Sequence, residues 1–388
     1  MNTHVSLEET LRIVRKIASD ELTPRAEEID KTGKWPEKSI RALQQAGLGG
    51  IAIPSELGGH GQGLTGVAKV CEILGHECAS TAMCFGMHLV GSAVLAAKAT
   101  PHQKEHYIAP IVKGEHLTTL SISEPGTGSH FYIPEAELKN EKNGKYTLNG
   151  TKSFVTNGSY ADSYVVSAVI PAPDTAVGQF TCVVVDNRSE GLNWKGKWEG
   201  IGMKGNSSRT VEINNLRLSE NNILGEKGDQ IWYVFEVVAP YFLTAMAGTY
   251  LGIAASALEE ATNHLNNRSH THTGTALSHQ PVLQHRLGAI WAKVESARQL
   301  LYSAAEKGDT GSPDALLSVL SSKAVVSDCV VEVVNEVMTL MGGKAYASEG
   351  KLSRHLRDAR ASHVMAPTTD LLKTWMGRAL LDVPLLGD

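Results

Sequence analysis

The sequence predicts an α+β protein with a helical N-terminal part, a central antiparallel β-domain and a helical C-terminal bundle. Apolar residues recur at helical spacing up to about residue 116 and again after residue 225. Between these segments the pattern changes to short β-branched runs separated by turn residues. We place the domain boundaries at 1–115, 116–226 and 227–388. Since neither helical set closes a core alone, we expect the two to pack together, with a ligand pocket at the junction.

The composition is that of an ordinary globular protein. The chain has 388 residues, of which 42% are hydrophobic, and 36 basic and 41 acidic residues give a net charge of -5. This charge provides no basic surface for nucleic acid and no lysine-rich membrane patch. The cysteines are irregularly spaced without a CxxC pair, so we expect reduced thiols in a cytoplasmic protein. They are Cys71, Cys78, Cys84, Cys182 and Cys329.

The N-terminal part begins with a predicted amphipathic helix. In residues 1–22, leucines and isoleucines recur among charged residues, which is typical of a mature helix and not of a signal or transit peptide. Turn signals at 32–36, 56–62 and 100–101 divide the rest of this part into further helices.

The C-terminal part opens with an almost wholly apolar stretch at 231–258. It contains Glu236 and Pro240 and many small residues, which let helices approach closely inside a bundle. We therefore predict a central buried helix and no membrane span. Breaks at 266–279, 307–313 and 342–343 divide the remainder into long helices.

Three motifs occur in an order that resembles the acyl-CoA dehydrogenase family. SISEPGTGSH at 121–130 is similar to that family's loop with Thr-Glu-Pro-Gly-x-Gly-Ser-Asp, and LNGTKSFVTNGSYAD at 148–162 is similar to its Gly-x-Lys-x-(Trp/Phe)-Ile-(Thr/Ser)-Asn strand and turn. VMTLMGGKAYASEGKLSRHLRDAR at 337–360 resembles its Gly-Gly turn followed by Arg-Asp-Ala. Weaker matches at 204–228 and around Arg268 extend the resemblance along nearly the whole chain. It implies a flavoprotein that binds FAD.

The first motif has the residue types that a flavin ring needs. Gly126 and Gly128 let the backbone turn sharply and present N–H groups to a ligand. Ile122 and Ser123 can offer backbone groups and a hydroxyl to the edge of the ring. The resemblance also implies that Ser129 contacts the ligand near the ring.

The second motif adds a strand face. Phe154 and Thr156 alternate with Lys152 along a predicted strand, so all three should point to one face. An aromatic ring and a hydroxyl on that face suit the far side of the flavin and its N5 edge.

The resemblance also implies contacts to the adenosine half of FAD. Arg268 would reach the pyrophosphate in a neighbouring subunit, although a solvated loop charge is the alternative. Gly342 and Gly343 would allow close approach of the ADP part, whereas Thr339 replaces a glutamine of the family. A site shared between subunits implies a homo-oligomer, as a dimer of dimers.

The sequence departs from the family at the catalytic base. By resemblance, a glutamate removes the α-proton of a thioester while hydride passes from the β-carbon to flavin N5. The matching step here begins with Ala366, and the alternative position on the central helix is Phe242. Glu236 lies on a different face of that helix unless Pro240 kinks it.

Three histidines are candidate replacements, because neutral imidazole accepts a proton near pH 7. They are His88, His130 and His363, although a packed or solvent-facing histidine is the favoured interpretation of each. Thr368 and Asp370 follow the empty position and are expected near the cofactor, although Asp370 suits a helix cap better.

His270 and His272 form a His-x-His pair, a spacing that can occur in metal sites. No third ligand is nearby in the sequence, and Ser, Thr and Gly surround the pair. We interpret it as a loop and predict no metal site.

Three functions remain open. The first is an FAD-dependent dehydrogenase that desaturates an acyl thioester of CoA or of a carrier protein, with a non-standard base and an acceptor flavoprotein for the electrons. The second is a flavin-dependent monooxygenase that receives reduced FMN or FAD from a reductase. The third is a non-catalytic ligand-binding relative. We favour the first, because the β-domain motifs remain close to dehydrogenase form.

Overall fold

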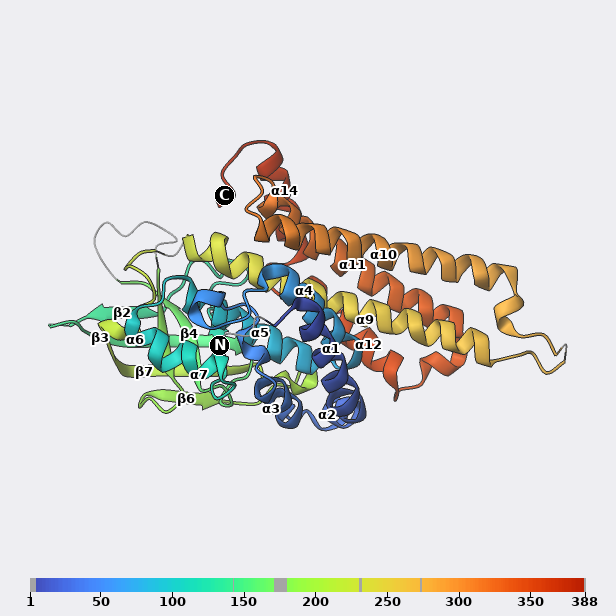
Figure 1. Cartoon of the computed structure of the whole chain (residues 1–388), viewed down its shortest axis with the longest axis horizontal. Coiled ribbons are helices and arrows are strands. Elements are labelled where there is room, and N and C mark those ends of the chain that lie inside the picture. The colour runs from blue at the N-terminus through green and yellow to red at the C-terminus, as the bar shows by residue number, and fades with distance from the viewer. Residues whose placement is uncertain (1–4, 142, 171–179, 230–231, 273, 387–388) are drawn as a thin grey trace.

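The computed structural model describes residues 5–141, 143–170, 180–229, 232–272 and 274–386. It confirms the predicted α+β class with helices, then strands, then helices along the chain. The β-domain occupies one end of an elongated molecule, and the long helices of the C-terminal bundle extend toward the other (Figure 1). The N-terminal helices lie between them.

The N-terminal part is wholly helical. Its first helix is amphipathic as predicted and begins after Ser6, whose side chain accepts a hydrogen bond from the Glu9 N–H at 3.2 Å. Residues 1–4 of the predicted first helix lie outside the described residues. The helices are α1 Leu7–Ile17, α2 Ala26–Thr32, α3 Glu37–Gln45, α4 Gly63–Glu77, α5 Ala79–Ala97, α6 Pro101–Gln103 and α7 Ala109–Val112.

The C-terminal part consists of long antiparallel helices and three short ones at its end. A π-helical turn, η8 Tyr233–Val238, leads into α9 without a break. The helices are α9 Ala239–Asn267, α10 Pro281–Asp309, α11 Ala315–Met341, α12 Lys351–Ala359, α13 Ala361–Val364 and α14 Thr369–Leu380.

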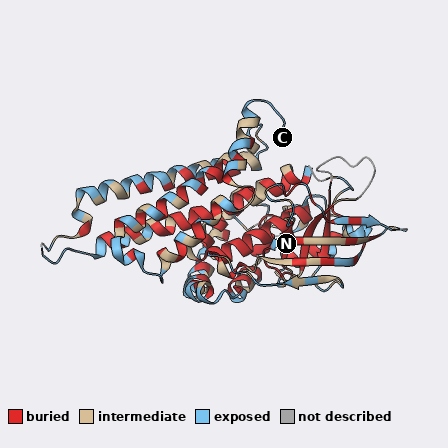
Figure 2. Cartoon of the chain, turned by 180° about the vertical axis from the view of Figure 1, so that it is seen from behind, coloured by how far each residue is buried: buried red, intermediate tan, exposed pale blue. Residues whose placement is uncertain are grey.

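Within the described residues, two helices are long and apolar enough to cross a membrane, and both are largely buried in the core. Ala79–Ala97 is 100% buried and Tyr233–Asn267 is 83% buried within their most apolar windows. Burial is concentrated in the middle of the molecule, while the outer face of α10 is exposed (Figure 2). The predicted buried central helix is therefore confirmed, although Ile231 lies outside the described residues.

A close contact between α4 and α9 joins the two helical parts. A Cβ at Gly75 of α4 would lie 2.3 Å from the Thr249 carbonyl oxygen, and one at Gly252 of α9 would lie 2.2 Å from the Glu72 carbonyl oxygen. Only glycine permits this backbone approach. The N- and C-terminal parts thus share one core, as their separate lengths require.

The β-domain contains two sheets, with strand orders β1-β4-β5 and β2-β3-β7-β6. The predicted antiparallel β-domain is confirmed, with one exception, because β1 and β4 are parallel. Strands β2 and β3, which pair in the other sheet, form the long crossover that parallel pairing needs. The strands are β1 Thr118–Ser121, β2 Glu137–Asn140, β3 Lys145–Val155, β4 Ser163–Ala168, β5 Thr181–Asp186, β6 Leu192–Lys195 and β7 Arg209–Ser219.

Buried polar contacts attach the β-domain to the helices. The Asn157 amide, just after β3, accepts from the Trp35 indole N–H and donates to the Cys84 carbonyl oxygen, both at 2.9 Å. On the other side, the Asp358 carboxylate of α12 accepts the Met203 N–H at 2.5 Å. These contacts fix the β-domain against both helical parts, with the ligand-facing residues between them.

Gly252→Ala should destabilise the protein by about 1–3 kcal/mol, because the new methyl overlaps the α4 backbone. The matched control is Gly288→Ala in α10, where nothing lies within 4 Å of the added Cβ. That change should be neutral or should stabilise by up to about 1 kcal/mol through helix propensity. Thermal unfolding followed by circular dichroism compares them, and equal melting temperatures would contradict the packing argument.

Candidate active site

A cavity of about 640 Å³ lies at the junction of the three parts. Its walls come from α5, the end of β1 and the loop after it, β3, the 198–208 loop, the start of α9, and the segment from α12 to residue 367. Most of the lining is apolar, including Met83 and Met87 on one face of α5 and Phe131 after the β1 loop. Such a cavity can enclose a planar ring together with an acyl chain.

The loop of the first motif forms one wall. Ile122, Ser123, Gly128 and Ser129 all line the cavity. Gly128 has a φ of +53°, and nothing lies within 4 Å of where a Cβ would be. A left-handed, unobstructed position of this kind lets a ligand approach the backbone.

A buried ion pair holds this loop in place. The Glu124 carboxylate accepts from the Lys152 ammonium at 2.5 Å, and from the backbone N–H groups of Glu135 and Ala136 at 2.5 and 3.1 Å. Both charged side chains are essentially inaccessible to solvent. Burial lowers the pKa of Lys152, and the adjacent carboxylate opposes this effect. Glu124 is therefore a structural carboxylate whose oxygens are engaged.

The prediction that Lys152, Phe154 and Thr156 share one face is wrong for Lys152. The β3–β7 register shifts between Lys152 and Val155, and Phe154 has a φ of +54°. This bulge re-aims the strand. As a result Ser153, Phe154 and Thr156 line the cavity, while Lys152 points into the β-domain interior.

The bulge also exposes an aromatic ring at the cavity mouth. Phe154 is 67% exposed, and its ring meets that of Trp198 edge to face at 6.4 Å. A left-handed aromatic residue is strained, and such strain is common where a ligand is held. The two rings provide an apolar border for a planar group.

Charged groups at the cavity wall are few and mostly engaged. Among the described lining residues, Glu124 is the only carboxylate, and Arg357 and Arg360 are the only cations. The Arg357 guanidinium donates to both oxygens of Asp30, at 2.7 and 2.5 Å, and to the Ile201 carbonyl at 3.0 Å. The cavity interior consequently offers hydroxyls and apolar surface, with no unengaged acid.

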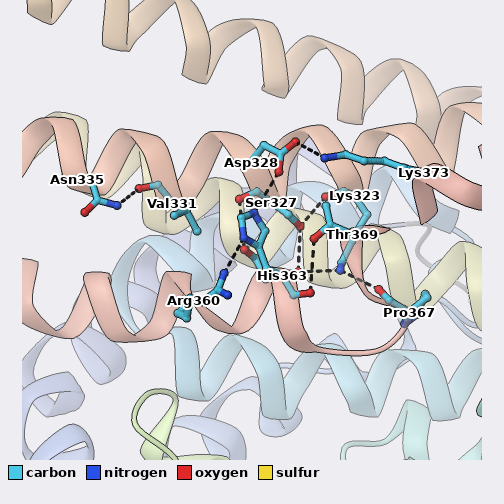
Figure 3. Close-up of polar contacts among 11 residues, drawn as sticks. Lys323, Ser327, Asp328, Val331, Asn335, Arg360, His363, Pro367, Thr369 and Lys373 are labelled. Carbon is cyan, nitrogen blue, oxygen red and sulfur yellow. Dashed lines mark hydrogen bonds and ion pairs between the residues drawn. The ribbon is translucent and has the colours of Figure 1, made fainter. Parts of the chain in front are cut away.

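None of the three candidate histidines lines the cavity. His88 is a fully buried residue of α5, its Nδ1 accepts the Thr118 N–H at 3.1 Å, and burial lowers its pKa to about 3. His130 is exposed and makes an edge contact with the Tyr132 ring. His363 turns outward to Arg360 and Asp328, at 2.7 and 3.1 Å (Figure 3).

Glu236 is also excluded by its position. It is exposed in the π-helical turn before α9 and does not line the cavity. The turn redirects the chain but leaves the carboxylate in solvent.

Comparison with known proteins agrees with this geometry. Family models described as the acyl-CoA dehydrogenase N-terminal, middle and C-terminal domains match residues 6–115, 119–216 and 243–381. A cyclohex-1-ene-1-carbonyl-CoA dehydrogenase of Geobacter metallireducens is 30% identical over 96% of this chain and 97% of its own. An acyl-CoA dehydrogenase of Bacillus subtilis is 28% identical, over 97% and 99%.

The fold gives the same result. The solved structure of butyryl-CoA dehydrogenase from Megasphaera elsdenii superposes with a TM-score of 0.90 at 25% identity, covering 97% of this chain and 98% of the other. The chain belongs to the acyl-CoA dehydrogenase family. It is accordingly a flavoprotein oxidoreductase of the class that acts on CH–CH groups, as the sequence predicts.

The two positions that the resemblance assigns to the glutamate both face the cavity. Ala366 lines it from the segment after α13, and Phe242 lines it from the first turn of α9. Neither side chain can accept a proton. Six of the predicted cofactor residues surround the same space, namely Ile122, Ser123, Gly128, Ser129, Phe154 and Thr156.

The remaining predicted cofactor residues lie elsewhere. Arg268 follows α9, and Thr339, Gly342 and Gly343 close α11, at the end of the bundle remote from the β-domain (Figure 1). They do not line the cavity, so their contacts to FAD stay a prediction that depends on a second subunit. No group of three potential metal ligands occurs in the part of the chain that the structure describes, which includes His270 and His272.

The residues after Ala366 cap a helix, but the cap is Thr368 and not Asp370, the residue predicted from the sequence. Thr368 is the N-cap of α14 and accepts the Leu371 N–H at 3.3 Å. Asp370 is exposed in the first turn, so it is not the predicted cap, although its charge is favourable at a helix N-terminus. Neither residue lines the cavity.

Some residues that line the cavity were not predicted from the sequence as site residues. Ser121 opens the first motif, and its buried Oγ has no hydrogen-bond partner in the described structure. Met83 and Met87 stand four apart on α5, a spacing that could have marked a common face. An unpaired hydroxyl, the open backbone at Gly128 and the exposed Phe154 together fit the edge and face of a flavin ring.

Glu124→Ala should destabilise the protein by about 3–5 kcal/mol, because the Lys152 ammonium would be left buried and unpaired. Adding Lys152→Met should recover part of this loss. The control Glu137→Ala, exposed on β2, should change stability by less than about 0.5 kcal/mol. Urea unfolding measures all three, and a loss for Glu124→Ala no larger than the control's would refute the structural role.

Asp358 makes stability depend on pH. Burial raises its pKa from 3.8 to about 6, so the folded state binds more protons between these values. Its stabilising contribution is present below about pH 4 and is lost as the pH rises through about 6. Asp358→Asn cannot titrate, so its stability relative to the wild type should rise by up to about 3 kcal/mol from pH 4 to pH 7. Urea unfolding across this range tests it; a constant difference would contradict the shift.

Proposed function

We propose that the protein is an FAD-dependent oxidoreductase that desaturates an acyl thioester, carried by CoA or by a carrier protein, without a carboxylate base at either usual position. The observation that supports this most is the single cavity that joins the flavin-motif residues to Ala366 and Phe242. FAD bound there supplies a hydride acceptor. The proposal extends to electron transfer from this site to an acceptor flavoprotein.

The chain's own residues then hold and orient the flavin ring and the acyl chain. Backbone groups at Ile122 and the hydroxyls of Ser123 and Thr156 suit the ring edge. Met83 and Met87 offer apolar, adaptable surface to an acyl chain. Because Glu124 is engaged by Lys152 and Ala366 is apolar, neither can take the α-proton, so a water molecule or hydroxide ion in the cavity accepts it.

The direct test is anaerobic reduction of the bound flavin. The flavin that co-purifies is identified, and acyl-CoAs of different chain length and branching are added without oxygen while flavin absorbance is followed. Bleaching by a thioester supports the proposal. Absence of bleaching with every thioester that binds would refute it.

Ala366→Glu should raise the rate of this reduction by about 10²-fold or more, since a positioned general base typically contributes about 10² to 10⁴. The matched control is Ala366→Gln, which has the same size and cannot act as a base. Equal rates for the two variants, with thioester binding intact, would show that the missing carboxylate does not limit the reaction.

A second candidate is a flavin-dependent monooxygenase, favoured by the lack of a free acid in the apolar cavity. That activity requires tighter binding of reduced than of oxidised FMN or FAD, and oxygen consumption when reduced flavin is supplied. Titration with both redox forms, together with an oxygen electrode, distinguishes it from the dehydrogenase.

A further inference from the structure

One wall of the cavity is a short irregular segment between two helices. Helix α13 ends at Val364 and α14 begins at Thr369. Between them, Met365, Ala366 and Pro367 line the cavity. The direction in which the side chain of residue 366 enters the cavity therefore depends on what fixes this backbone.

A buried lysine on α11 holds that backbone from behind. The Lys323 ammonium donates to the Pro367 carbonyl oxygen at 3.0 Å (Figure 3). It also donates to the carbonyl oxygens of Ser362 at 2.8 Å and Met365 at 3.5 Å. Three N–H donors thus meet three carbonyls that the short helix α13 and the turn after it leave without helical partners. The contacts span the whole wall.

Ser327, one turn further along α11, adds a second tether. Its hydroxyl proton is shared between the Lys323 carbonyl oxygen of the same helix at 2.7 Å and the Ser362 carbonyl oxygen at 3.2 Å, and the Ser362 hydroxyl lies 3.3 Å from the Ser327 carbonyl oxygen. Both serines are buried. The wall is thus bound to a 27-residue helix at both of its ends, by Lys323 and Ser327 at the first and by Lys323 at the second.

Burying the Lys323 ammonium costs desolvation free energy that no ion pair offsets within the described residues. Lys323 is fully buried, and within the described residues no carboxylate lies at ion-pair distance from its ammonium. Asp328, the nearest acid that acts on it, is itself paired with His363 and Lys373 on the outer side. Burial lowers the pKa of Lys323 to about 7. An apolar residue would pack against the core without this desolvation cost.

We propose that Lys323 is a positioning residue of the cavity: by binding the carbonyls of residues 362, 365 and 367, it sets the backbone from which residue 366 faces the ligand. The inference rests on the proposed function only in that a thioester occupies this cavity. It predicts that loosening the wall weakens ligand binding more than it weakens the fold.

The test compares Lys323→Met with Lys373→Met, an exposed lysine that pairs with Asp328 from α14. Amide hydrogen exchange is measured over residues 361–372, together with the melting temperature and the affinities for FAD and butyryl-CoA. Lys323→Met should speed exchange in this segment and weaken butyryl-CoA binding, each by about tenfold, the effect expected for losing a hydrogen-bonded tether to a charged group. Lys373→Met should match the wild type.

Unchanged exchange and butyryl-CoA affinity in folded Lys323→Met would overturn the inference. If that variant does not fold, Ser327→Ala decides, since it removes one tether to Ser362 and should speed exchange about threefold at the same amides; no change there also overturns it. A wild type that fails to bind butyryl-CoA would count against the proposed function alone, because the exchange measurement tests the tether without a ligand.

Discussion

The structure depends on enclosing two apolar helices. Helix α5 is buried throughout, and most of α9 is buried as well, so each must be surrounded by protein on all sides. Helix α4 covers α9 at the glycine contact, while α10 and α11 cover its other faces. Because these partners come from opposite ends of the chain, the helical parts must close together. The β-domain between them is left against one side of the bundle, where the cavity forms.

The polar groups around the cavity mostly hold its edges. Glu124 and Lys152 hold the β1 loop, Arg357 and Asp30 hold the 201 region, and Asp358 holds Met203. Each of these groups has its partner within the protein, so each serves to hold a part of the cavity wall in place. The interior that remains is apolar with a few hydroxyls, which suits an apolar ligand held by a small number of polar contacts.

The segment that carries Ala366 is also held by a charged group, in this case from outside the cavity. Lys323 binds the backbone of the segment that presents residue 366, at a core position where an apolar residue would otherwise pack. A side chain that acts on a bound ligand must be placed closely, because a misplacement of about 1 Å can cost about 10²-fold in rate. This chain has the tether and an alanine at the position that it orients.

The sequence alone determined the fold class, the buried central helix and the family. Each of these follows from local periodicity or from contiguous motifs, which need no knowledge of distant contacts. Only the tertiary structure decided which side chains face the cavity. A bulge in β3 turned Lys152 inward, the packing of α5 against Thr118 buried His88, and Asp328 on α11 drew His363 outward. These orientations depend on residues 30 or more positions away in the chain, where sequence spacing gives no information about direction.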